Sequence, residues 1–278
     1  MNRNIIIMNF SGVYEKQRLK AVLEEKCETG NVTEVNFRDI PGTNCYCDGP
    51  AEEEIKKRIC SYGPEGMHFL DSGNYHYLTK IWLELVKDPF ELLVFDHHTD
   101  MQRPAFGGIL SCGGWIREAL ETNKNLKHVI LVGPPNTAME ETQKELLEDG
   151  EELIKKVTWI CEEKFLENVD NQDKIREFCG ILEESQETPS LPLYISIDKD
   201  VLLESEGKTN WDQGNVRVEQ ILKFTENYIK GRRLIGTDVC GEDPENDNDE
   251  EQVICRETSE EIARIMGISI EQIREMLD

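Results

Sequence analysis

The sequence predicts an α/β fold, a three-layer α/β/α sandwich around a mainly parallel sheet. Short apolar runs recur along the chain, and most are near-continuous hydrophobics, a pattern typical of parallel strands covered on both faces. Segments with helical periodicity and charged faces separate these runs, as expected of right-handed βαβ units. The chain has 278 residues, 38% of them hydrophobic and 31% charged, which is enough for one large core in a soluble globular protein.

Seven apolar runs are the expected strands: Asn4–Phe10, Thr33–Phe37, Met67–Leu70, Leu92–Phe95, His128–Val132, Leu193–Ile197 and Leu234–Thr237. The expected helices are Glu15–Lys26, Ala51–Cys60, Leu78–Val86, Trp115–Thr122, Glu140–Lys156, Gln172–Ser185, Val218–Lys230, Ser259–Met266 and Ser269–Asp278. Ser259 is the expected N-cap of its helix, and Gly267 joins the last two helices. Gly241–Glu251 is expected to be a long acidic loop. No linker divides the chain, so residues 1–278 are predicted to form one domain.

The net charge of −25 restricts the class of partner. Such a field repels phosphate backbones, so we expect no nucleic-acid binding, and it favours metal ions and small cationic compounds. No apolar stretch reaches 18 residues and no signal peptide is evident, so we expect a cytoplasmic protein without a membrane span. The nine cysteines are then mostly free thiols. Cys45, Cys47 and Cys60 lack the second spaced pair typical of a structural zinc site.

Acidic side chains follow two of the expected strands. Asp96, His98 and Asp100 come directly after one strand, and Asp198 and Asp200 after another. Side chains at alternate positions of an extended chain share a face, so each set is expected to point to one side. Ligands gather at the carboxyl ends of strands in an open α/β sheet. Carboxylates crowded there without a cation would repel one another, which indicates bound divalent ions.

His76 completes the candidate site. It follows a third strand end through a turn rich in Ser, Gly and Asn, which could present it to the same pocket, although a core histidine is the alternative. Four carboxylates balance the charge of two divalent ions. Because the ligands are mainly carboxylates with two imidazoles, we expect two Mn²⁺ ions. The six predicted ligands are His76, Asp96, His98, Asp100, Asp198 and Asp200.

These motifs resemble those of the ureohydrolase family, which includes arginase and agmatinase. Asp96–Asp100 resembles the family's Asp-x-His-x-Asp motif, Ser196–Asp200 its Ser-x-Asp-x-Asp motif and, more loosely, Gly73–His76 its Gly-Gly-Asp-His motif. The resemblance spans about residues 60 to 245 and implies an arginase-like fold. It also implies a hydrolase in which two Mn²⁺ ions activate water to attack a guanidinium or amidine carbon. By resemblance, Asp100 accepts the proton of that water.

Several residues outside these motifs differ from the pattern of the family. Cys112 stands near the place of the family's proton-shuttle His, so we predict either a catalytic role for Cys112 or a buried thiol in a Gly-rich turn. Glu242 is similar to the Glu that holds the guanidinium, but it is shifted by one residue. Trp211 is predicted to flank a cationic substrate, with a packing role as the alternative. The segment after the first motif lacks the residues by which arginases bind an amino acid, so L-arginine is not the default substrate.

Three functions remain open from the sequence. The first is a dinuclear manganese hydrolase that cleaves a C–N bond of a small cationic guanidino or amidino compound. The second is a metal-dependent amide deacetylase of the same fold, which Asp100 disfavours. The third is a metal-binding regulatory protein that has lost turnover, which the missing histidine favours. The resemblance also makes a homo-oligomer possible, although no feature of the sequence requires one.

Overall fold

The computed structural model describes residues 4–26, 31–104, 107–184, 191–265 and 267. Within these residues, eight strands form one sheet in which every neighbouring pair is parallel. Their order across the sheet is β2 (Asn31–Asn36), β1 (Asn4–Asn9), β4 (Gly66–Phe69), β10 (Leu234–Cys240), β9 (Leu193–Asp198), β5 (Phe90–Phe95), β7 (Leu126–Val132) and β8 (Val157–Ile160). Each of the seven expected strands has a counterpart in this sheet.

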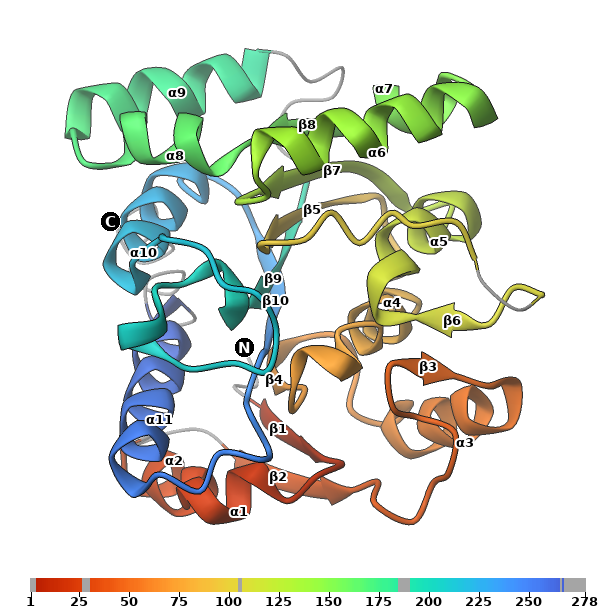
Figure 1. Ribbon diagram of the computed structural model, residues 1–278, viewed down its shortest axis with the longest axis vertical. Helices are drawn as coiled ribbons and strands as arrows, with labels where there is room; N and C mark the ends of the chain where they lie inside the picture. Colours follow the sequence, from red (N-terminus) through yellow and green to blue (C-terminus); the bar gives the residue numbers. More distant parts are fainter. Residues whose placement is uncertain (1–3, 27–30, 105–106, 185–190, 266, 268–278) are drawn as a thin grey trace.

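Helices cover both faces of the sheet (Figure 1). One layer contains α1 (Val13–Gln17), α2 (Leu19–Lys26), α8 (Glu162–Val169), α9 (Gln172–Glu184), α10 (Val218–Tyr228) and α11 (Asp249–Ala263). The other contains α3 (Gly49–Ile59), α4 (Leu78–Leu83), α5 (Trp115–Thr122), α6 (Asn136–Asp149) and α7 (Glu152–Lys155).

Two buried hydrophobic clusters, one on each face of the sheet, join these layers. In β1, Ile6 and Met8 pack into one cluster, whereas Ile5 and Ile7 pack into the other. Since successive side chains of a strand point to opposite faces, both faces of this strand must be apolar. The predicted three-layer α/β/α sandwich with a parallel sheet is confirmed.

Two expected helices are each interrupted. The helix expected at Glu15–Lys26 is divided into α1 and α2 at Arg18, whose φ of 56° lies in the left-handed region. The helix expected at Glu140–Lys156 is divided into α6 and α7 at Gly150, whose φ is 122°. A left-handed residue ends an α-helix, and neither interruption alters the charged pattern from which one continuous helix was predicted.

The acidic loop is shorter than predicted, because α11 begins at Asp249. The Asn248 side chain caps this helix by accepting hydrogen bonds from the backbone N–H groups of Glu250 and Glu251. Acidic residues in the first turn suit the positive end of the helix dipole, so this acidic segment favours a helix start. The N-cap predicted at Ser259 is therefore wrong, since Ser259 lies buried inside α11.

Some short elements were not predicted. They are β8, α8 and a two-stranded antiparallel sheet that joins β3 (Tyr46–Cys47) to β6 (Leu110–Ser111). The predicted helix Ser269–Asp278 lies outside the described residues. In the part of the chain that the structure describes, no helix has the length and apolar character needed to cross a bilayer.

The central strands bring the candidate residues to one edge of the sheet. β4, β10, β9 and β5 are consecutive neighbours, and all four run in the same direction. The segments that follow them therefore meet at a single edge, although they are far apart in the sequence.

Candidate metal centre

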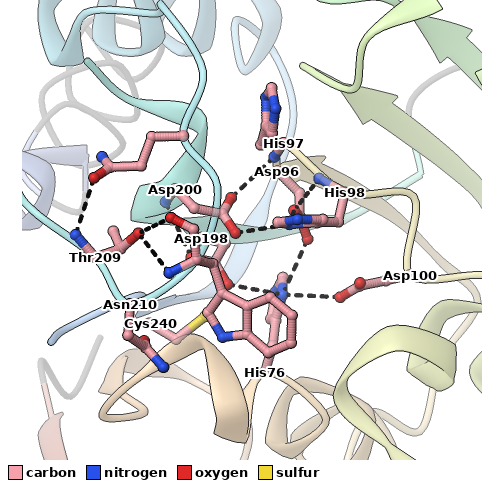
Figure 2. A network of polar contacts seen from close by, with 12 residues as sticks. His76, Asp96, His97, His98, Asp100, Asp198, Asp200, Thr209, Asn210 and Cys240 are labelled. Atoms are coloured by element: carbon pink, nitrogen blue, oxygen red, sulfur yellow. Dashed lines mark hydrogen bonds and ion pairs between the residues drawn. The ribbon is translucent and has the colours of Figure 1, made fainter. Parts of the chain in front are cut away.

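The six predicted ligands lie in one cluster at this edge (Figure 2). His76 follows β4 and the short 3-10 helix η1 (Gly73–Tyr75). Asp96, His98 and Asp100 follow β5. Asp198 is the last residue of β9, and Asp200 lies in the 3-10 helix η3 (Lys199–Val201) directly after it.

One half of the cluster surrounds His76. Its Nδ1 lies 3.1 Å from Asp96 Oδ2, 3.1 Å from Asp100 Oδ2 and 3.4 Å from Asp198 Oδ2. The imidazole is 1% exposed, so these carboxylates meet it away from bulk water. One nitrogen facing three carboxylates from two other segments is an arrangement typical of a metal site.

The other half is built around His98. Its Nδ1 lies 2.8 Å from Asp200 Oδ2 and 3.5 Å from Asp96 Oδ1. Asp96 thus stands between the two halves, with one oxygen toward each imidazole. A carboxylate shared between two cation positions is what a two-metal site requires.

The segment after β5 is a turn, not the continued strand from which its geometry was predicted. Asp96 Oδ1 accepts a hydrogen bond of 2.6 Å from the backbone N–H of His98, and Asp100 has a left-handed φ of 49°. Strained backbone at a non-glycine residue clusters at functional sites. The Trp115 Nε1–H donates a 2.6 Å hydrogen bond to Asp100 Oδ2 and orients that carboxylate.

Charge crowding perturbs the acidic groups strongly. Burial and the charge of Asp96 raise the pKa of Asp100 to about 7. Burial, together with the charges of Asp198 and Asp96, also raises the pKa of Asp200 well above its usual range. Asp96 is the exception, because its interactions with the nearby His76 and His98 side chains outweigh its burial and lower its pKa. Several carboxylates here resist ionisation unless positive charge is supplied.

The two histidines supply part of that charge. Burial opposes protonation of His98, but Asp200 and Asp96 outweigh it and raise its pKa to about 12. Burial is likewise outweighed at His76, where neighbouring negative groups raise the pKa well above 6.5. A protonated imidazole offsets the negative charge of the nearby carboxylates, as a bound metal cation would.

The residues fit a pair of divalent ions. His76 Nδ1 and Asp96 Oδ2 are buried and form no hydrogen bond, even though they lie close together. Ligand atoms within 4.8 Å of one another form three groups: His76, Asp96 and Asp100; Asp96, His98 and Asp200; and His76, Asp198 and Cys240. The first two groups divide the oxygen and nitrogen donors between two positions that share Asp96.

Cys240 is a neighbour of this cluster that was not predicted. It ends β10 opposite Asp198, and its thiol donates to Asp198 Oδ2 over 3.1 Å. Its position at the carboxyl end of a central strand was the available signal. Beside it, Gly241 has a φ of 98°, and a Cβ there would lie 2.5 Å from Asp198 Oδ1, so the chain needs glycine to pass this close.

A chain of buried hydrogen bonds orients His76 through its Nε2 atom. Its Nε2 lies 2.9 Å from Ser196 Oγ, which is 3.2 Å from Thr79 Oγ1, and that hydroxyl donates to Asp238 Oδ1 over 3.2 Å. Hydrogen bonding at Nε2 leaves Nδ1 directed at the carboxylates. Metal-ligating histidines are commonly oriented in this way through their second nitrogen.

A cavity of about 570 Å³ opens over the cluster. Cys112 and Trp211 both line it, as the predictions of a catalytic and a substrate-binding side chain require, and Trp211 is 39% exposed. One face of α6 also lines the cavity and contributes Glu141 and Glu145. These two acidic residues were not predicted, because nothing in an exposed helical pattern distinguishes a face over a pocket from a face in solvent.

Glu242 is placed differently from the prediction. It is fully buried and is not among the residues that line the cavity. Its carboxylate accepts from Lys199 Nζ, from Ser259 Oγ at 3.1 Å and from Gln17 Nε2 at 2.7 Å. The buried ammonium of Lys199 pairs with this carboxylate in the structure, and the contact of Glu242 with a guanidinium stays a prediction.

Comparisons with known proteins agree with this fold and show the family. The family model described as the arginase family matches residues 66–268. An uncharacterized protein of Thermotoga maritima is 33% identical over 239 residues, which cover 86% of this chain and 80% of that protein. Among solved structures, proclavaminate amidino hydrolase from Streptomyces clavuligerus superposes with a TM-score of 0.68 at 14% identity, over 97% of this chain and 93% of that one. Trypanosoma cruzi formiminoglutamase with Mn²⁺ gives 0.64 at 10% identity, over 95% and 93%.

Proposed function

Because this chain belongs to the arginase family, we propose that it is a metal-dependent hydrolase that cleaves a C–N bond of a small cationic guanidino or amidino compound. The proposal includes two Mn²⁺ ions, held by His76, Asp96, Asp100, Asp198 and the pair His98 and Asp200. It also treats residues 1–278 as a single arginase-like domain.

One observation carries the proposal: two sets of ligand atoms share Asp96, and each set has an imidazole of its own. Asp96 and His76 also contribute buried polar atoms that form no hydrogen bond. Mn²⁺ is favoured by the carboxylate-rich donor set. Solved structures of an amidino hydrolase and of a formiminoglutamase with Mn²⁺ share this fold, which supports the same chemistry here.

Asp100 is the proposed proton acceptor. When bound, two divalent ions supply the charge that lowers the pKa of water and polarises the carbon under attack. Asp100 faces the cavity, and the indole N–H of Trp115 fixes its orientation. A carboxylate held in this way can take a proton from the attacking water and return it to the departing amine.

The proposed catalytic contribution of Cys112 is limited to donating a hydrogen bond or a proton. Burial and the nearby charge of Asp100 raise the pKa of its thiol well above the usual value. A thiol with a raised pKa remains protonated near neutral pH, so it accepts protons poorly.

The walls of the cavity select a cationic substrate. Glu141, Glu145 and Asp212 line it, and among its described lining residues none is Lys or Arg. Trp211 stands beside His98, with 5.5 Å between ring centroids, and its exposed ring can contact a guanidinium by cation–π attraction. A substrate with an amine at its distal end meets negative charge here, whereas a distal carboxylate would find no basic partner.

The proposal is tested by offering the Mn²⁺-loaded protein a panel of small C–N compounds. The panel contains aminoalkylguanidines, guanidino acids, alkylguanidines with an uncharged tail, formimidoyl amino acids and acetylated amines. We expect urea release from guanidines, fastest with an amine-tailed one. Release of acetate alone would indicate a deacetylase, and no product with two ions still bound would indicate a non-catalytic binding protein.

Neutralising the acidic face of α6 tests how the substrate is selected. Glu141→Gln combined with Glu145→Gln is expected to raise KM for an aminoalkylguanidine by about 5-fold, because two partly solvated ion pairs contribute about 1 kcal/mol together. Within the described residues neither carboxylate has a hydrogen-bond or ion-pair partner, so the fold should be unaffected. Steady-state kinetics measures the effect, and kcat should change little.

The matched control is Glu140→Gln combined with Glu148→Gln. These residues lie on the same helix and do not line the cavity, and their substitution removes the same amount of charge. An equal rise in KM for the control pair would show that the effect comes from net charge rather than from this wall. The KM of an alkylguanidine whose tail carries no charge should be the same in all three proteins.

A further inference from the structure

Two cysteines face each other across the small antiparallel sheet beside the candidate metal centre. β3 and β6 pair Tyr46 with Ser111, so the same register places Cys45 opposite Cys112. The backbone N–H of Cys112 donates to the carbonyl of Cys45 over 2.9 Å, which continues this pairing by one residue. β3 and β6 lie side by side in Figure 1, at the end of the molecule that also carries α3 and α5.

The two cysteines lie just outside the paired residues of this sheet. Cys45 precedes β3 with a left-handed φ of 61°, and Cys112 follows β6, so their proximity rests on the backbone hydrogen bond between them. Both thiols are free, and the Cys112 thiol is close enough to affect that of Cys45 by a side-chain hydrogen bond. The backbone hydrogen bond and the contact between the thiols thus make these two cysteines neighbours, as disulfide formation requires.

Both cysteines are also accessible from the cavity. Cys45 and Cys112 are partly exposed, and both line it. Cys47, two residues along β3, is buried and does not line the cavity. An oxidant small enough to enter the cavity therefore meets this pair and not Cys47.

The Cys112 segment supports the proposed proton acceptor. Gly113, the next residue, accepts a 2.9 Å hydrogen bond from the backbone N–H of Gln102. The backbone N–H of Ile116 donates to the carbonyl of Asp100 over 3.1 Å, and Trp115 holds the Asp100 carboxylate. A covalent link at Cys112 would restrain the wall that positions Asp100.

We propose that Cys45 and Cys112 form a reversible disulfide, an oxidation site that closes this wall of the cavity and inhibits the protein. With hydrogen peroxide, one thiol attacks the O–O bond to give a sulfenic acid and water. The second thiol then attacks that sulfur, forms the S–S bond and releases a second water. The net reaction consumes two thiols and one peroxide and gives one disulfide and two waters, and a dithiol reductant reverses it.

The test uses the full-length, Mn²⁺-loaded protein treated with hydrogen peroxide or diamide at mildly alkaline pH. Peptide mapping without reduction should find Cys45 joined to Cys112, with the loss of two hydrogen atoms. Turnover of the best substrate in the panel should fall by about 10- to 100-fold, since a displacement of about 1 Å at a reacting group has an effect of this size. Dithiothreitol should restore both the thiols and the turnover.

Two variants make the result specific. The activity of Cys45→Ser should be the same before and after treatment with the oxidant. Cys60→Ser is the matched control, because Cys60 is exposed and does not line the cavity, and it should be inhibited like the natural chain. Calorimetric binding of an aminoalkylguanidine before and after oxidation provides a readout that does not depend on turnover.

Three results would overturn the proposal. Both cysteines could remain open to alkylation after oxidation, the disulfide could form without any change in binding or turnover, or Cys45→Ser could be inhibited as strongly as the natural chain. If no compound of the panel is hydrolysed, the proposed function fails, whereas the mass and binding measurements still decide whether this site exists.

Discussion

Asp198→Asn is expected to remove at least one of the two proposed Mn²⁺ ions and to lower kcat/KM by about three orders of magnitude or more, because metal charge contributes several kcal/mol to such reactions. Asp198 Oδ2 lies in the ligand set around His76, and its other oxygen accepts from the backbone N–H of Asp200. Asparagine keeps the volume of the side chain but removes its charge. Elemental analysis after gel filtration measures the number of ions per chain.

Thermal unfolding separates loss of metal from loss of fold. Metal that binds only the folded state stabilises it by about 2.7 kcal/mol per site when free metal is 100 times Kd. Mn²⁺ should therefore raise the Tm of the natural chain and raise that of Asp198→Asn much less. Asp88→Asn, which replaces an exposed Asp outside the cluster, is the control and should behave like the natural chain.

The metal-free proteins should show the opposite order of stability. Burial and the charge of Asp96 raise the pKa of Asp198. An acid with a raised folded-state pKa contributes stability below its unfolded pKa, and that contribution is lost as pH rises through the folded value. After chelation, Asp198→Asn should thus be at least as stable as the natural chain at pH 7. An unchanged metal content in Asp198→Asn would show that the site has been assigned wrongly.

Breaking the buried ion pair between Lys199 and Glu242 is expected to reduce the free energy of unfolding by about 3–5 kcal/mol. Both side chains are at most 1% exposed. Lys199 Nζ also donates to Ser259 Oγ over 2.7 Å and to the carbonyl of Cys255 over 2.8 Å. Lys199→Met leaves the Glu242 carboxylate buried without its cation, and Glu242→Gln leaves the Lys199 ammonium without its anion.

The double variant measures the interaction energy between the two side chains. Lys199→Met combined with Glu242→Gln removes both charges, so its loss of stability should be smaller than the sum of the two single losses. Lys223→Met is the matched control, because the Lys223 pair with Glu219 is on the surface and should contribute less than about 1 kcal/mol. Urea unfolding of the metal-loaded proteins measures all four.

One member of this pair also lies between two proposed ligands in the chain. Lys199 separates Asp198 from Asp200, so losing its anchor should weaken Mn²⁺ binding as well as the fold. If Glu242 instead contacts substrate, Glu242→Gln would raise KM and leave unfolding unchanged. That result would contradict the buried placement of Glu242 and restore the prediction made from the motif.

Much of the fold could be predicted because its signals are local. The apolar runs at Asn4–Phe10 and Leu92–Phe95 are continuous, since both faces of a central parallel strand are buried. The three-layer sandwich and the resemblance to arginases are both confirmed. The interruptions at Arg18 and Gly150 were missed, because each depends on the backbone conformation of one residue within a pattern that remains helical.

For the candidate site, the sequence by itself determined which residue types stand at the strand ends: His76, then Asp96–Asp100, then Asp198 and Asp200. Each of these residues follows a strand closely in the sequence. Because the carboxyl ends of parallel strands lie at the same edge of the sheet, it could be predicted that these residues lie close together. Their assignment as metal ligands remains a prediction. Only the tertiary structure decided what surrounds them. It placed Glu242 beside the buried Lys199, a face of α6 over the cavity and Cys45 opposite Cys112. Such contacts join segments far apart in the sequence, and no local pattern specifies which side chains the packing of separate elements will bring together.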